Sequence, residues 1–147
     1  MIEVFIDGAS RGQGKNKASL GEAACAVVIF DKKKPAAQYA RGLGKRTNNE
    51  AEYEALIAAL LMCVMSDYRD PIIYSDSAVV VNQINDKWAC RNSRLIPLWL
   101  SVKEIQQEYR FRLVQVQRNK VSVADKLVNK FLNTLSQVKK GTNKSVK

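Results

Sequence analysis

Ile2-Glu3-Val4-Phe5-Ile6-Asp7-Gly8 is the stretch from which the fold can be worked out, because it joins a strand-like apolar run to a carboxylate. Its β-branched and aromatic residues at 2–6 predict a strand that Asp7-Gly8 ends or bends. The continuous apolar run at 23–30 predicts a second strand covered on both faces. A third strand is expected around 36–43, and the short connections between the three favour an antiparallel meander.

The remainder of the chain alternates between helical and strand-like patterns. Apolar residues recur at helical spacing from Thr47 to about Met65. Further along, the pattern predicts a strand at 72–74, helices at 78–85 and 95–109, a strand at 111–117 and a last helix at 122–138. This order predicts one α/β domain, residues 1–138, built as a mixed sheet with helices on its faces. The segment 139–147 has four lysines and no acid and is expected to be a flexible tail.

The charge and the residue types present restrict the classes of function that this chain can have. The 147 residues include 24 Lys and Arg against 14 Asp and Glu, a formal charge of +10, which suggests a polyanionic partner such as nucleic acid. The absence of histidine excludes Ser-His-Asp catalysis, Cys-His catalysis and any histidine-ligated zinc site. Three well-separated cysteines argue against a disulfide framework. Neither a signal peptide nor a membrane-spanning segment is visible, so a cytoplasmic location is expected. No obligate protein partner is evident from the sequence, and a monomer is expected.

Four carboxylates stand at positions that suggest a shared site. Asp7 and Asp76 each follow a strongly apolar strand, where an ionised acid is costly, and Glu52 and Asp125 lie in the first turns of two predicted helices. Converging without histidine, they would form an oxygen-ligated site suited to Mg²⁺ or Mn²⁺. Each acid also has a purely structural interpretation, as a turn residue, a helix cap, a first-turn acid or part of a capping box. Spacing alone leaves both interpretations open.

Four short motifs occur in an order that resembles one family. Phe5-Ile6-Asp7-Gly8-Ala9-Ser10, Thr47-Asn48-Asn49-Glu50-Ala51-Glu52, Ser75-Asp76-Ser77 and Ala124-Asp125-Lys126-Leu127 together resemble type 1 ribonuclease H, over about residues 2 to 133. The resemblance implies a ribonuclease H-like α/β fold, with a five-stranded mixed sheet in the order 3-2-1-4-5 flanked by helices. It also implies endonucleolytic hydrolysis of the RNA strand of RNA/DNA hybrids with two Mg²⁺ ions, or Mn²⁺, giving 5′-phosphate products. The family's catalytic and metal-binding acids map onto Asp7, Glu52, Asp76 and Asp125.

The same resemblance implies a set of substrate contacts. By position, these fall on Gln13, Lys45, Arg46, Thr47, Asn48, Asn49, Arg91 and Arg94. Gln13 and the Asn48-Asn49 pair match residues that contact the hybrid across its minor groove, where the 2′-hydroxyl tells RNA from DNA. Thr47 matches a hydroxyl that binds a DNA-strand phosphate. Many members also place a histidine just before the last acid; this chain has none, and Arg118 is a cationic candidate for that place.

Two other functions are consistent with these residues. The chain could be a catalytically silent module that binds hybrids or double-stranded RNA, although an intact set of four acids argues against it. It could also be another nuclease that shares the fold and the carboxylate chemistry. Cleavage assays on RNA/DNA, DNA/DNA and RNA/RNA duplexes separate the three functions.

Overall fold

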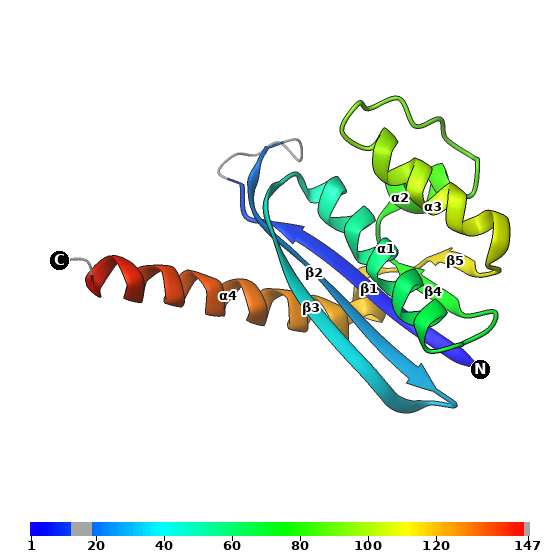
Figure 1. Cartoon of the computed structure of the whole chain (residues 1–147), viewed down its shortest axis with the longest axis horizontal. Helices are drawn as coiled ribbons and strands as arrows, with labels where there is room; N and C mark the ends of the chain where they lie inside the picture. The colour runs from blue at the N-terminus through cyan, green and yellow to red at the C-terminus, as the bar shows by residue number, and fades with distance from the viewer. Residues whose placement is uncertain (13–18, 146–147) are drawn as a thin grey trace.

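The computed structural model describes residues 1–12 and 19–145, with side chains placed as far as Lys139. Hydrogen bonding orders the strands β3-β2-β1-β4-β5, with β1 antiparallel to β2 and parallel to β4. This confirms the predicted five-stranded mixed sheet and its order (Figure 1). The elements are β1 (Ile2–Ser10), β2 (Gly21–Asp31), β3 (Lys34–Arg46), α1 (Asn48–Met65), β4 (Ile72–Ser75), α2 (Ala78–Ile84), α3 (Ile96–Glu108), β5 (Arg112–Gln115), a 3₁₀ turn (Arg118–Val121) and α4 (Ser122–Ser145).

β2 supplies both faces of the sheet with buried side chains, because successive residues of a strand point to opposite faces. Its odd-numbered residues over 25–29 lie in the core shared with α1 and α3, whereas the even-numbered residues over 24–28 lie in the core shared with α4. Figure 1 shows the same division, with α1 to α3 on one side of the sheet and α4 on the other. The prediction of a strand covered on both faces is confirmed.

β1 does not end at Asp7-Gly8, as the sequence predicted, but continues to Ser10. Its pairing with β2 extends to Ser10 opposite Ala23, so Asp7 lies inside a hydrogen-bonded strand. On its other side, β1 pairs with β4 only over Glu3–Phe5, and β4 ends at Ser75. Asp7 therefore stands beside the point where the neighbouring strand stops and its chain leaves the sheet.

α4 continues to Ser145, beyond the predicted end of the last helix at Val138. The sequence has no proline after Val138, and lysine is a good helix former, so the apolar pattern alone ended the predicted helix too early. Lys139 Nζ also forms an ion pair with Glu22 of β2 at 2.7 Å. Most of the backbone in the predicted tail is therefore helical, and the flexibility of that segment stays a prediction. Among the described residues, no helix is both long and apolar enough to cross a membrane.

Candidate active site

Three carboxylates meet where β1, β4 and α1 come together. Asp7, Glu52 and Asp76 each offer one oxygen, and these three oxygens lie within 4.8 Å of one another. Asp7 and Glu52 are almost fully buried, at 5% and 4% exposure, whereas Asp76 is partly exposed. Two buried acids and one accessible acid thus form a small anionic cluster that a solute can reach.

A capping box determines where α1 begins and hence which way Glu52 points. The Thr47 hydroxyl accepts a hydrogen bond from the backbone N–H of Glu50 at 3.2 Å, and the Thr47 N–H donates to the Glu50 carboxylate at 2.9 Å. Glu52, two residues later, lies on the buried face of the helix, and its Oε1 accepts the backbone N–H of Gly8 at 2.8 Å. Glu50 fills the capping role, which leaves Glu52 to face Asp7.

Burial and mutual repulsion perturb both buried acids. The pKa of Asp7 is raised to about 7, mainly by burial and then by the charges of Asp76 and Asp125. The pKa of Glu52 is raised well above its usual value, again by burial first and then by the charge of Asp7. The Glu52 Oε2 atom is buried and has no hydrogen-bond partner among the described residues. A bare carboxylate oxygen beside two other acids fits a divalent cation, which would satisfy that oxygen and offset the repulsion.

Asp125 approaches this cluster from the first turn of α4. It is not one of the three acids whose oxygens lie within 4.8 Å, but its charge contributes to the raised pKa of Asp7. Its Oδ1 accepts hydrogen bonds from Arg118 Nη2 at 3.3 Å and from Asn129 Nδ2 at 3.2 Å. Arg118 in turn lines a cavity of about 330 Å³, here called the acid cavity, together with Asp7, Glu52 and Asp76. The predicted cationic candidate therefore lies in the acid cavity and is held there by Asp125.

The predicted asparagine contacts lie at the acid cavity itself. Asn48 and Asn49 both line it, and the Asn48 Oδ1 accepts the backbone N–H of Ser10 at 3.2 Å. Thr47 stands directly before them as the cap of α1. Gln13 falls outside the residues that the structure describes. Two of the three predicted minor-groove residues thus border the carboxylates.

Three of the four predicted basic contacts, Lys45, Arg46 and Arg94, lie near the start of α1. Lys45 and Arg46 end β3 directly before the helix, and Arg91 and Arg94 are exposed in the connection between α2 and α3. Arg94 Nε donates to Glu50 Oε1 at 3.0 Å, which ties that connection to the beginning of α1. Sequence reasoning missed this pair because 44 positions separate its members. The sequence offered one indication that Glu50 has a structural role, its position three residues after Thr47 in a capping box.

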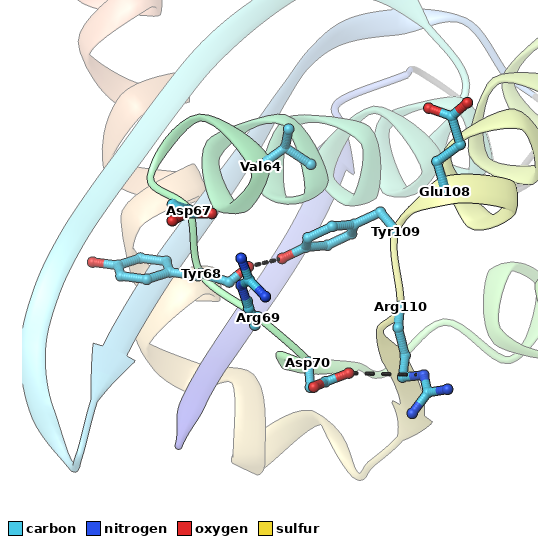
Figure 2. Close-up of a pocket in the computed structure, with 8 residues that line it drawn as sticks. All are labelled: Val64, Asp67, Tyr68, Arg69, Asp70, Glu108, Tyr109 and Arg110. Atoms are coloured by element: carbon cyan, nitrogen blue, oxygen red, sulfur yellow. Dashed lines mark hydrogen bonds and ion pairs between the residues drawn. The ribbon is translucent and has the colours of Figure 1, made fainter.

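A second hollow, of about 390 Å³, lies near the other end of α1 and differs in character from the acid cavity (Figure 2). Its lining mixes charges of both signs, and Arg110 Nε stands 3.9 Å from Asp70 Oδ1. The Tyr109 hydroxyl donates to the backbone carbonyl of Tyr68 at 2.5 Å and closes one side of the hollow. Among the described residues, the cluster of three potential metal ligands belongs to the acid cavity, not to this hollow.

The strand order, the helices on both faces and the carboxylate cluster beside the central strand define a ribonuclease H-like protein. A family model described as reverse transcriptase-like matches residues 11–131, and the chain belongs to this family. Divalent-metal dependence goes with this family, and the acid cavity offers the oxygen ligands for such ions.

Three relatives illustrate the similarity. Ribonuclease HI of Halobacterium salinarum is 29% identical over 133 residues, covering 90% of this chain and 64% of that protein, and its crystal structure matches with a TM-score of 0.82. LC11 ribonuclease H1, isolated from compost and solved in complex with an RNA/DNA hybrid, is 29% identical with a TM-score of 0.78, over 88% of this chain and 95% of that one. A bifunctional protein of Mycobacterium tuberculosis is 28% identical over 139 residues, but the match to 92% of this chain covers only 36% of that protein. The chain thus spans little more than a third of this longer relative.

The raised pKa values predict that the metal-free protein loses stability as the pH rises. Asp7 titrates at about 7 in the folded chain, against its ordinary value of 3.8, so the folded state binds more protons between these two values. The stability contributed by this proton is complete below pH 3.8 and is lost as the pH rises through about 7. Thermal and urea unfolding in EDTA across this range measure the effect.

The matched comparison for this effect is Asp7→Asn, which removes the titrating charge and keeps the shape. At pH 8 its unfolding free energy in EDTA should exceed that of the wild type by on the order of 2 kcal/mol, and the difference should vanish towards pH 4. Adding Mg²⁺ at pH 8 should stabilise the wild type more than the variant. Parallel pH profiles for the two proteins would contradict the electrostatic account of the cluster.

Proposed function

We propose that this protein is an endoribonuclease that hydrolyses the RNA strand of RNA/DNA hybrids and leaves 5′-phosphate ends. The observation that carries the proposal is the meeting of Asp7, Glu52 and Asp76, with Asp125 beside them, next to the central strand of a ribonuclease H-like sheet. A relative of the same fold, LC11 ribonuclease H1, was solved with an RNA/DNA hybrid. The formal charge of +10 carried by the whole chain also supports a polyanionic substrate.

The four acids would hold two Mg²⁺ ions, or Mn²⁺ in their place. Asp7, which interacts with Glu52, Asp76 and Asp125, would be one of the residues that hold these ions. When bound, paired divalent ions would supply the activation of a water and the stabilisation of the leaving 3′ oxygen of a phosphodiester. The chain itself gathers the carboxylates, keeps two of them out of bulk water and holds Glu52 through the N–H of Gly8.

Substrate contacts are proposed for residues on the rim of the acid cavity. Asn48 and Asn49 would lie against the minor groove and contact the 2′-hydroxyl of the RNA strand. A backbone phosphate of the DNA strand would approach the start of α1. The residues proposed for the remaining phosphate and groove contacts are Lys45, Arg46, Thr47, Arg91 and Arg94, together with Gln13, which lies outside the described residues.

Cleavage of a labelled hybrid in Mg²⁺ and in Mn²⁺, side by side, tests the proposal. We expect cuts in the RNA strand alone, and no cleavage of a DNA duplex of the same sequence. Binding without cleavage in either metal would favour a silent module, and cleavage of DNA/DNA or RNA/RNA instead would favour another nuclease of this fold. All four acids come from one chain and the three cysteines are free thiols, which supports action as a monomer in a reducing cytoplasm.

We propose that Arg118 supplies a positive charge at the place where many members of the family have a histidine. Its guanidinium lines the acid cavity, so it can stabilise negative charge that develops on the phosphodiester during hydrolysis. Arg118→Ala should therefore lower kcat by roughly 10²-fold with little change in KM. Arg112→Ala, which removes an exposed arginine of β5, should cleave at the wild-type rate. A wild-type kcat for Arg118→Ala in steady-state cleavage would exclude this role.

A further inference from the structure

Glu50 is a buried acid that the proposed metal chemistry does not use. It is 7% exposed, and its Oε1 accepts hydrogen bonds from the Thr47 N–H at 2.9 Å and from Arg94 Nε at 3.0 Å. This one carboxylate therefore joins the beginning of α1 to the connection between α2 and α3.

Arg94 is held by this contact and still presents its charge to solvent. Its side chain is 48% exposed, and among the described residues only the Nε of its guanidinium has a protein acceptor. Its backbone N–H donates to Asn92 Oδ1 at 2.9 Å, which braces the loop that carries it. A guanidinium fixed through Nε leaves both terminal nitrogens available, an arrangement suited to the oxygens of a phosphate.

The Glu50–Arg94 pair stands at the border of the acid cavity without being part of it. Asn48 and Asn49, the two residues before Glu50, line the cavity, whereas Arg94 does not. A phosphate that reached the acids would therefore be a different one from a phosphate that met Arg94. In a duplex, the second phosphate would belong to the backbone at some distance from the cleaved bond.

We propose that Glu50 is a positioning residue that holds Arg94 ready to bind a backbone phosphate of the duplex away from the cleaved bond. The identity of the duplex rests on the proposed function. An arginine that is already held loses less conformational freedom when it binds, so the tether strengthens the contact. Simple electrostatics makes the opposite prediction, because removing an acid beside a polyanion should strengthen binding. The sign of the effect of Glu50 thus distinguishes the two accounts.

Binding of a fluorescent RNA/DNA hybrid to the full chain in EDTA tests the proposal. Arg94→Gln should weaken binding about tenfold and reduce the magnitude of the log–log salt slope by about 1. Glu50→Gln should weaken binding about threefold even though it removes a negative charge, because its amide oxygen still caps α1 but no longer holds Arg94 by charge. In the Glu50→Gln background, Arg94→Gln should have a smaller effect than it has alone.

Glu54→Gln is the matched control. Glu54 lies one turn further along α1 and pairs with Arg41 at 3.0 Å, so its removal should leave hybrid affinity unchanged or slightly higher. In Mg²⁺, Glu50→Gln should raise KM about threefold with kcat unchanged, a split that a general loss of folding would not produce. Arg94→Lys keeps the charge without the guanidinium fork and should bind less tightly than the wild type.

The binding of each variant tests a different part of the proposed Glu50–Arg94 contact. Binding by Glu50→Gln as tight as that of the wild type would overturn the positioning role, and unchanged binding by Arg94→Gln would overturn the phosphate contact. Wild-type binding by Arg94→Lys would show that the held guanidinium is not needed, which also overturns the proposal, even where Glu50→Gln proves too unstable to assay. Failure of the wild type to cleave any hybrid would instead overturn the proposed function.

Discussion

Replacing Asp7 with asparagine is expected to lower the rate of hybrid hydrolysis by roughly 10³-fold or more. Asp7 interacts with each of the other three acids, so no neighbour can take over its position. Asparagine keeps the shape and one oxygen but lacks the negative charge with which a carboxylate binds a divalent ion more strongly than a neutral amide does. The measurement is the single-turnover rate of RNA-strand cleavage in a labelled hybrid with saturating Mg²⁺, repeated with Mn²⁺.

Hybrid binding by the same variant separates lost chemistry from lost structure. In EDTA, Asp7→Asn should bind the hybrid as tightly as the wild type or more tightly, because it removes a negative charge from a cavity that faces phosphates. Asp31→Asn is the control: Asp31 ends β2 opposite Ile2, at the other end of β1 from the acid cavity, and its loss should leave cleavage unchanged. Near-normal turnover by Asp7→Asn would refute the assignment of the acids.

The sheet and its acids could be predicted because their signals are local and repeat along the chain. The apolar run at 23–30 indicated a strand with two covered faces, and β2 indeed contributes alternate residues to two cores. Asp7 and Asp76 each follow a strand-like run, and the parallel pairing of β1 with β4 brings those two runs side by side. The strand order then followed from the family that the motifs resemble.

The end of β1 could not be predicted in this way. Asp7-Gly8 has the local chemistry of a turn, but pairing with β2 keeps the backbone extended as far as Ser10. The partner that decides this, Ala23, lies 13 positions further along the chain than Ser10. The local pattern of Asp7-Gly8 therefore predicted the wrong backbone conformation, because tertiary pairing overrides the local preference for a turn.

The Arg118–Asp125 contact could be expected from the sequence more readily than the Glu50–Arg94 contact. Arg118 and Asp125 are 7 positions apart, so the search for a cation just before the last acid could find it. Glu50 and Arg94 lie 44 positions apart and meet only because the connection between α2 and α3 returns to the start of α1. The capping motif explained Glu50 completely in local terms, and nothing local suggested a second partner.

Gly8→Ala is expected to destabilise the fold by about 3 kcal/mol or more and to abolish cleavage. A Cβ at Gly8 would lie 2.2 Å from the carbonyl carbon of Ala51 and 2.4 Å from the backbone nitrogen of Glu52. These atoms belong to the backbone of α1, so the clash can be relieved only by moving the helix away from β1. The same movement would break the Gly8 N–H···Glu52 hydrogen bond and separate Glu52 from Asp7.

Thermal unfolding measures the first part of this prediction, with an expected drop in midpoint of roughly 10 °C for a chain of this size. Gly42→Ala in β3 is the control, because the nearest neighbours of its Cβ would be side-chain atoms of Phe131 and Leu135, at 3.3 Å and 3.4 Å, which can shift. That variant should stay within about 1 kcal/mol of the wild type. If Gly8→Ala instead melts and cleaves like the wild type, close contact between α1 and β1 is not what brings Glu52 to Asp7. Loss of both stability and cleavage in Gly8→Ala would mean that Asp7 and Gly8 act together. Asp7 supplies one proposed metal ligand, and Gly8, which has no side chain, leaves room for α1 to bring Glu52, the next proposed ligand, close to it.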